Sequence, residues 1–307
     1  MQMLSWPALR EAAELAIYAS GARHIARWRS RGGTLVLAYH NIVPRGTPIG
    51  GDPWLQQPVD DFAAQLDALM ETHDVIPLRE ALEPPRASPR RPRAVITFDD
   101  AYRGAVTCGV EELARRSLPA TIFVAPAFLG GRSFWWDQLT RPGAELADDV
   151  REFALTTLRG DGDEICAWAG RNGLPSRQLP DYALCASEEE LRAAITRADL
   201  TVGSHSWSHL NLTQLGSAQL AEELTRPLAW LRSRFDVFVP FLTYPYGLSS
   251  AAVEAAAAVA GYAAAFRVTG GWIRDAGSNT FAIPRFNVPS GITSRAFALR
   301  TDGMLCP

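Results

Sequence analysis

Short apolar runs alternate with amphipathic stretches along most of the chain. Residues 59–73 and 220–235 carry apolar side chains at helical spacing. Residues 111–117 also predict a helix, and the alanine-rich run that begins at Ala251 predicts a buried one. Apolar runs of strand length lie between them, at residues 34–39, 94–98, 120–124, 200–203, 238–244, 263–268 and 281–288. Strands that alternate with helices predict an α/β fold with a mainly parallel sheet, open or closed into a barrel.

Two local sequence patterns predict where one helix begins and where another is interrupted. Ser187 with Glu190 three residues later forms a capping-box pattern, which predicts that a helix begins just before Leu191. Pro227 lies inside the 220–235 stretch. Because proline lacks a backbone N–H and clashes with the preceding turn, we expect it to kink that helix or to end its first half.

The alternation stops between about residues 130 and 197. This part is polar and contains a turn signal, Gly160-Asp161-Gly162. We interpret it as an insertion that forms a lid or a wall of the substrate site. Its most distinctive piece is SFWWD at residues 133–137. Adjacent tryptophans are typical of a core, but aromatic faces also stack on sugars.

The N-terminal residues 1–31 are read as one amphipathic helix over residues 7–30. Its second half is basic, with Arg23, Arg27 and Arg29 beside apolar residues. Such a helix either lies on an anionic membrane surface or packs on the domain with a solvated arginine face. Acidic residues and the lack of a continuous apolar core argue against a secretory signal. The sequence therefore predicts a cytoplasmic protein, with peripheral contact at the inner membrane face as an alternative.

Composition excludes several functions. The 307 residues carry a formal net charge of −3, which does not fit a basic nucleic-acid-binding protein. All 30 basic residues are arginine, so no lysine can hold a phosphate or form a Schiff base. None of the four cysteines forms a C-x-x-C pair, and scattered reduced thiols are expected rather than disulfides or a thiolate metal site.

Three short polar motifs follow predicted strands, and the carboxyl ends of strands are where sites form in α/β folds. The first is TFDD, which ends in Asp99 and Asp100. Neighbouring residues on a strand point to opposite faces, so one carboxylate can bind a metal while the other accepts a proton. Alone, the two aspartates are weak evidence for a metal site, because they can simply cap the next helix.

The second motif, HSWSH, places His205 and His209 four residues apart, a spacing at which two imidazoles can share a cation. Two structural histidines bonded to nearby backbone are the competing interpretation. The third motif, TYPYG, contains Tyr246 and fixes a turn that can direct backbone N–H groups at a developing oxyanion. An ordinary loop is the alternative here.

In order, TFDD, HSWSH and YPYG resemble the first three motifs of the polysaccharide deacetylase family, also called the NodB homology domain or carbohydrate esterase family 4. AYHNI at residues 38–42 is similar to the YH motif of a branch that includes biofilm poly-N-acetylglucosamine deacetylases. The resemblance covers residues 34–290 apart from the insertion. It implies a distorted (β/α) barrel of seven or eight strands over residues 32–307.

The resemblance assigns Asp100, His205 and His209 as metal ligands, Asp99 as general base and the Tyr246 backbone N–H as oxyanion donor. The family's C-terminal Leu-x-His motif is missing, because no histidine follows His209. In the branch with the YH motif the early histidine takes over as general acid, which makes His40 the candidate here.

The arginine that usually precedes the third motif is also missing, and Arg285 is the candidate that orients Asp99 in its place. The expected cofactor is a divalent cation, with Zn²⁺ the default and Fe²⁺, Co²⁺ or Ni²⁺ compatible with the same ligands.

The predicted reaction removes acetyl groups from the amino sugars of a glycan. The metal would activate a water molecule and Asp99 would take its proton. Two alternatives stay open. One is a deformylase or deacetylase of a lipid-linked sugar or small amide, which the amphipathic helix favours. The other is a catalytically weak glycan-binding module, which the missing Leu-x-His motif favours.

Overall fold

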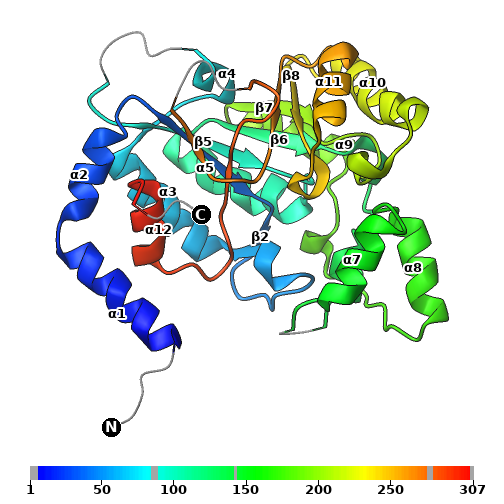
Figure 1. The fold of residues 1–307 in the computed structure, drawn as a ribbon, viewed down its shortest axis with the longest axis horizontal. Coiled ribbons are helices and arrows are strands. Elements are labelled where there is room, and N and C mark those ends of the chain that lie inside the picture. Colours follow the sequence, from blue (N-terminus) through cyan, green and yellow to red (C-terminus); the bar gives the residue numbers. More distant parts are fainter. Residues whose placement is uncertain (1–5, 84–88, 142–143, 275–278, 305–307) are drawn as a thin grey trace.

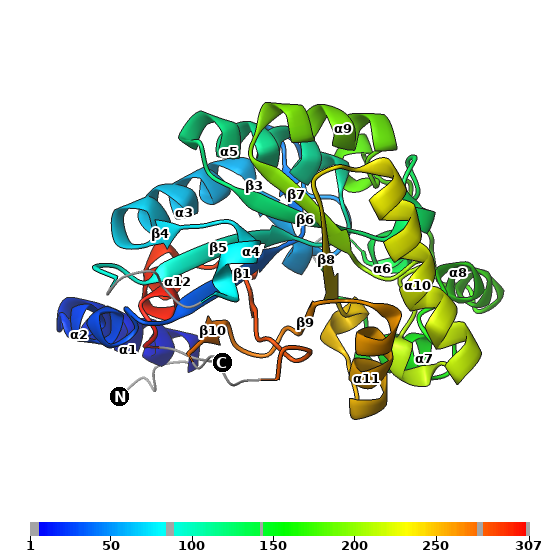
Figure 2. The same cartoon turned by 90° about the horizontal axis from the view of Figure 1, so that it is seen from above.

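A curled, mainly parallel β-sheet forms the centre of the computed structural model, which describes residues 6–83, 89–141, 144–274 and 279–304 (Figures 1 and 2). Along its main path the strand order is β10-β1-β5-β6-β7-β8-β9, while β4 pairs with β5 and β11 with β1. Only the β1–β10 pairing is antiparallel among these ladders. The seven strands of the main path form a half-barrel, as expected for a distorted (β/α) barrel.

The strands of this sheet match most of the predicted apolar runs. Their bounds are β1 Thr34–Tyr39, β4 Asp74–Val75, β5 Arg93–Phe98, β6 Ala120–Val124, β7 Leu200–Ser204, β8 Phe238–Thr243, β9 Ala264–Phe266, β10 Trp272–Ile273 and β11 Phe286–Asn287. The last predicted strand is wrong in length, because only two residues of 281–288 pair as β11. A separate two-stranded sheet joins β2 (Asn41–Val43) to β3 (Gln56–Pro58).

Side chains of successive strand residues enter different cores. Leu35 and Leu37 of β1, with Ile96 and Phe98 of β5, pack in the large cluster that includes residues of the outer helices. Val36, Val95 and Phe123 pack in a smaller cluster together with residues of β8, β9 and the short helix α4. This alternation of two faces explains why the strands are apolar at nearly every position.

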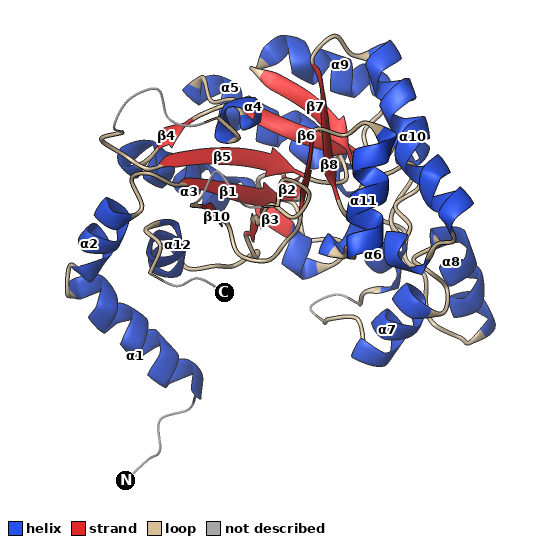
Figure 3. Ribbon diagram, turned by 45° about the horizontal axis from the view of Figure 1, so that its top comes forward, coloured by secondary structure: helices blue, strands red, loops and turns tan. Residues whose placement is uncertain are grey.

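Helices follow the strands and cover the outer face of the sheet (Figure 3). They are α3 Val59–Thr72, α5 Val110–Arg116, α10 Ser217–Arg234, α11 Ala251–Ala260 and α12 Ser294–Thr301, whereas α4 Leu78–Ala81 packs on the other face in the cluster that contains Val36 and Val95. The expectation that Pro227 ends the first half of its helix is wrong, since α10 runs through it, whereas a kink at Pro227 stays a prediction. The expectation that α11 is buried holds for one face only, because Val253 and Ala257 are buried whereas Val259 is 89% exposed.

The insertion contributes four helices: α6 Trp135–Leu139, α7 Asp148–Thr156, α8 Gly162–Arg171 and α9 Glu188–Arg197. The predicted capping box of α9 is present, with Glu190 N–H donating to Ser187 Oγ at 3.1 Å and Ser187 N–H to the Glu190 carboxylate at 2.8 Å. The helices α7 and α8 lie at the lower right of the molecule in Figure 1, below the sheet and apart from α10.

The N-terminal segment forms two helices rather than one, α1 Trp6–Ala19 and α2 Ala22–Arg29. The chain turns at Gly21, whose φ of 73° lies in the left-handed region that glycine adopts readily. Arg23 and Arg27 pair with Asp302 beyond α12, at 3.5 and 3.2 Å. Membrane contact through this segment stays a prediction.

No helix in the described ranges is long and apolar enough to cross a membrane. Cys108, Cys166 and Cys185 are free thiols, as expected, and Cys306 lies outside the described residues.

Candidate metal centre and active-site cavity

The first two motifs bring three potential metal ligands together at the carboxyl ends of β5 and β7. Asp100 Oδ1 lies 3.5 Å from His205 Nε2 and 3.4 Å from His209 Nε2. The two Nε2 atoms lie 3.1 Å apart. All three side chains are buried, and their donor atoms lie within 4.8 Å of one another. The loops after two separate strands therefore converge on one point, as the sequence predicts.

The backbone holds these side chains in uncommon conformations. Seven non-glycine residues in the described ranges have positive φ, and five of them belong to the motifs or directly follow one: Asp100, Ala101, Ser206, His209 and Tyr246. Such conformations cost about 1–3 kcal/mol each and persist where the surrounding structure imposes them. Because these costly conformations cluster in the motifs, we infer that they are kept for the side-chain positions they produce.

Hydrogen bonding favours one tautomer of His205. Its Nδ1 lies 2.8 Å from the Thr243 carbonyl oxygen and 2.7 Å from the Thr243 hydroxyl. The hydroxyl can donate or accept but the carbonyl can only accept, so both contacts are satisfied when Nδ1 carries the proton. The unprotonated Nε2 then faces Asp100 and His209. A backbone carbonyl bound to the second nitrogen is the usual arrangement for a metal-binding histidine. Burial lowers the pKa of both His205 and His209, which keeps the rings in the neutral form that binds metals.

Asp100 has the properties of a metal ligand. Its Oδ1 is buried and has no hydrogen-bond partner. Burial and the nearby carboxylates of Asp99 and Asp137 raise its pKa well above the ordinary range. A divalent cation among the three donors would reverse this effect, because it supplies the positive charge that the site lacks. One carboxylate and two neutral imidazoles fit Zn²⁺ and the other expected cations.

Arg285 forms a buried, two-pronged ion pair with Asp99. Its Nη1 donates to Asp99 Oδ1 at 2.8 Å and its Nη2 to Oδ2 at 2.7 Å, and the Arg285 side chain is fully buried. Burial alone would raise the pKa of Asp99, but the charge of Arg285 overcomes it and holds that pKa well below its usual value. The last part of the chain thus supplies an arginine that keeps Asp99 ionised and oriented.

His40 directly follows β1 and lines the same cavity as Asp99 and His205. Burial lowers the pKa of His40 to about 4, although the Asp99 carboxylate acts in the opposite direction. The ring is therefore neutral at pH 7 before substrate binds. The structure brings His40 to the site, and its role as an acid stays a prediction.

Tyr246 lies in the turn after β8, and its ring packs edge-on against His209 with the centroids 4.7 Å apart. Its hydroxyl donates to the Gly160 carbonyl at 3.3 Å and accepts from Trp135 Nε1 at 3.1 Å. The side chain therefore connects the third motif to the insertion, which leaves the backbone as the part of Tyr246 available to an oxyanion.

The SFWWD segment forms an aromatic wall around His209. Phe134 stacks on Trp136 with centroids 4.4 Å apart, and both rings lie within 5.2 Å of the His209 ring, centroid to centroid. Trp135 and Trp136 are 2% and 4% exposed, so both are core residues. Trp136 also lines the cavity. The insertion thus provides a wall of the site.

A cavity of about 460 Å³ contains the predicted residues. His40, Asp99, Asp100, His205, His209 and Tyr246 line it together. Its volume lies within the range of about 300–1,000 Å³ typical of small-molecule sites. Arg285 does not line it and contacts Asp99 instead.

A polar network beside the site was not predicted from the sequence. Buried Asp137 accepts hydrogen bonds from Tyr102 OH at 2.5 Å, from the Asp52 N–H at 2.8 Å and from Gln56 Nε2 at 3.2 Å. Asp52 in turn accepts from Arg151 of α7 at 2.8 Å. Single aspartates carry no periodic signal, but Asp137 of α6 ends the SFWWD segment that already stands out.

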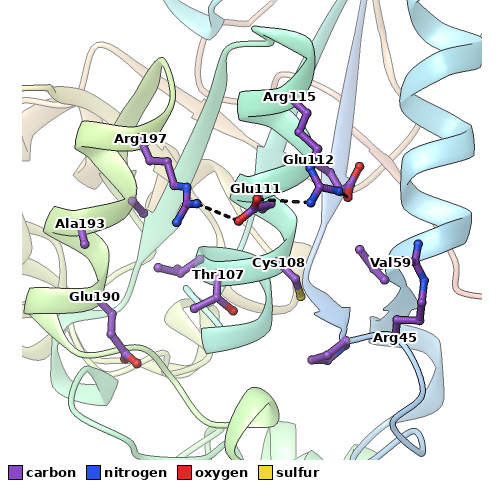
Figure 4. A pocket seen from close by; sticks show the side chains of 13 residues that line it. Arg45, Val59, Thr107, Cys108, Glu111, Glu112, Arg115, Glu190, Ala193 and Arg197 are labelled. Carbon is purple, nitrogen blue, oxygen red and sulfur yellow. Dashed lines mark hydrogen bonds and ion pairs between the residues drawn. The ribbon is translucent and has the colours of Figure 1, made fainter.

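A second cavity, of about 560 Å³, lies between α5, α9 and the segment at Arg45 and Val59 (Figure 4). Its charged groups pair with one another: Glu111 contacts Arg115 at 3.3 Å and Arg197 at 3.1 Å. Glu190 pairs with Arg103 at 2.9 Å. This cavity therefore offers a ligand fewer unpaired polar groups than the cavity that contains Asp100.

The chain is similar to known proteins in sequence and in fold. The sequence model described as polysaccharide deacetylase matches residues 86–265. IcaB from Ammonifex degensii superposes with a TM-score of 0.61 at 17% identity, over 89% of this chain and 98% of that one. The deacetylase PplD from Streptococcus pyogenes, solved with acetate, gives 0.59 at 14% identity, over 86% and 96%.

A de-N-acetylase from Aggregatibacter actinomycetemcomitans gives a TM-score of 0.60 at 11% identity, over 87% of this chain and 99% of that one. At these identities the likeness to solved structures concerns the fold. No curated protein sequence matches the chain.

Proposed function

This chain belongs to the polysaccharide deacetylase family, and from that premise we propose that it is a metal-dependent N-deacetylase of glycans that contain N-acetylated amino sugars. Membership makes it a hydrolase of carbon–nitrogen bonds other than peptide bonds. The observation that carries the metal-dependent part is the buried group of Asp100, His205 and His209, in which Asp100 Oδ1 lacks a hydrogen-bond partner.

Asp100, His205 and His209 would hold the cation. A bound divalent cation of this kind polarises the acetyl carbonyl and lowers the pKa of a bound water towards about 7. Zn²⁺ is the proposed ion, since one carboxylate and two imidazoles match its catalytic sites, and Fe²⁺, Co²⁺ or Ni²⁺ accept the same ligands.

Asp99 would act as general base. It is ionised at neutral pH, because the charge of Arg285 holds its pKa low. As water attacks the acetyl carbon, one water proton moves to the Asp99 carboxylate. Arg285 engages both carboxylate oxygens and so fixes the direction in which Asp99 can accept it.

The Tyr246 backbone N–H would donate to the oxygen that becomes negative as the tetrahedral intermediate forms. The left-handed turn at Tyr246, with φ 60°, lies on the cavity wall directly after β8. A donor fixed in this way needs little reorganisation during the reaction, which is why such donors are effective.

His40 would protonate the leaving nitrogen. Its pKa of about 4 in the free protein means that the ring is neutral before the reaction. Negative charge that develops on the substrate raises the proton affinity of a nearby imidazole. The proton that water gives up to Asp99 can then reach the nitrogen through His40, as the carbon–nitrogen bond breaks to give acetate and a free amine.

Removal of the imidazole tests this role of His40. We expect His40→Ala to lower kcat by about 10²–10⁴-fold, the usual contribution of a general acid. The loss should be smaller on 4-nitroacetanilide, whose weakly basic leaving group needs less protonation. Near-wild-type turnover of sugar substrates by a metal-loaded His40→Ala protein would remove His40 from the mechanism.

The function itself is tested by product analysis. The metal-loaded protein, incubated with N-acetylglucosamine oligomers of one to five units, should release acetate and leave free amines in equal amounts. Formate release from an N-formyl sugar without acetate release from any oligomer would favour a deformylase. Tight metal and glycan binding without release of either acid would favour a binding module.

A further inference from the structure

The mouth of the active-site cavity carries an exposed tryptophan. Trp54 lines the cavity, and its side chain is 51% exposed. By contrast Trp136, deeper in the same cavity, is 4% exposed, and Asp100 is 3% exposed. The cavity therefore extends from the buried Asp100, His205 and His209 to an indole at its mouth.

Trp54 is held on a rigid turn rather than on a mobile loop tip. Its N–H donates to Asp52 Oδ1 at 3.1 Å, and its carbonyl accepts from the Ser290 N–H at 3.2 Å. Asp52 is fixed on the other side by the Asp137 carboxylate, through its own N–H at 2.8 Å, and by Arg151 at 2.8 Å. The hydrogen bonds among Asp52, Asp137 and Arg151, which have no role in the proposed mechanism, thus position this turn and join it to α7 of the insertion.

A ligand that covers the exposed part of the indole gains free energy, because apolar surface contributes about 25 cal/mol per Å² on burial. Leu248, which is 40% exposed, lines the same cavity. The insertion contributes charged lining residues, of which Glu145 is exposed and Arg151 pairs with Asp52, as well as apolar Leu155 and Trp136. A lining that combines an aromatic face with charged groups suits a sugar ring, which has an apolar face and hydroxyl edges, better than an acyl chain.

We propose that Trp54 forms a subsite for the sugar next to the reacting unit, so that the substrate is an oligosaccharide or polysaccharide rather than a free or lipid-linked monosaccharide. This inference rests on the proposed deacetylase function. The reacting unit reaches the buried Asp100, His205 and His209, and the adjoining ring of the same chain leaves through the mouth and stacks on the indole.

The kinetics of Trp54 variants on substrates of different length test this subsite. We expect Trp54→Ala to raise KM for the N-acetylglucosamine tetramer about tenfold, a loss of about 1.4 kcal/mol, with kcat unchanged. Its kcat/KM for the N-acetylglucosamine monomer should equal that of the wild type. Trp54→Phe should restore most of the affinity, because an aromatic face remains.

Trp28 provides the matched control. It is 60% exposed on α2 and does not line the cavity, so Trp28→Ala should leave tetramer and monomer kinetics unchanged. If Trp54→Ala lowered kcat/KM equally for tetramer and monomer, or for neither, the proposed subsite would be overturned. A loss confined to octyl N-acetylglucosaminide, which would indicate a lipid-linked substrate, would also overturn it.

Calorimetric binding of the tetramer to wild type and Trp54→Ala separates failure of the subsite from failure of the function. Weaker binding by Trp54→Ala supports the subsite even if the wild type releases no acetate, and that result would reject only the deacetylase function. Equal tetramer affinity in both proteins, with acetate release by the wild type, would reject only the subsite.

Discussion

Asp99→Asn should lower kcat for N-acetylglucosamine oligomers by about 10²–10⁴-fold while the protein still binds metal, because an amide cannot accept the water proton. Asp99 does not belong to the group of three ligands, so the cation should remain. Metal content and acetate release, measured on the same preparation, check both parts of this expectation.

The substitution also leaves Arg285 buried without its carboxylate. Loss of one partner from a buried ion pair typically costs about 3–5 kcal/mol, so we expect a lower Tm as well. Bound metal shows that the variant is folded despite this. Asp302→Asn is the matched control: its carboxylate is also buried and paired with arginines, but it does not line the cavity. It should retain wild-type kcat. A metal-loaded Asp99→Asn protein within threefold of the wild type would exclude Asp99 as the base.

His205→Ala should weaken metal binding by at least about 100-fold, since even outer partners of a metal ligand contribute about 10–100-fold. Acetate release should fall in parallel at limiting metal concentration. The affinity can be measured by competition with a chromogenic chelator at fixed pH.

His24→Ala controls for the loss of an imidazole as such. His24 is exposed on α2, where its ring contacts Arg27, and it does not line the cavity. Its removal should leave the affinity unchanged. Equal metal affinity in wild type and His205→Ala would show that the cation lies elsewhere.

Local patterns were sufficient to predict most of the sheet. Strand-length apolar runs identify β1, β5, β6, β7 and β8, because buried parallel strands are apolar on both faces. The polar motifs after β5 and β7 were expected at the same edge of the sheet, where the carboxyl ends of parallel strands lie. The choice of Asp100, His205 and His209 as one ligand group came from the family resemblance, and the structure brings these three side chains together.

Features that depend on distant contacts were harder to predict. The Arg285–Asp99 pair joins residues 186 positions apart, and only the missing motif arginine suggested it. The Asp52–Asp137 network joins single polar residues of different segments, which have no periodicity. The break at Gly21 was missed because amphipathic spacing continues across the turn. The expectation that Pro227 ends a helix failed because tertiary packing outweighs helix propensity.

The most direct test of the central claim is a crystal of the zinc-loaded protein with data collected at the zinc absorption edge. The account predicts an anomalous peak at about 2.0–2.2 Å from Asp100 Oδ1, His205 Nε2 and His209 Nε2. A zinc peak bound by other residues, with none among these three, would contradict it.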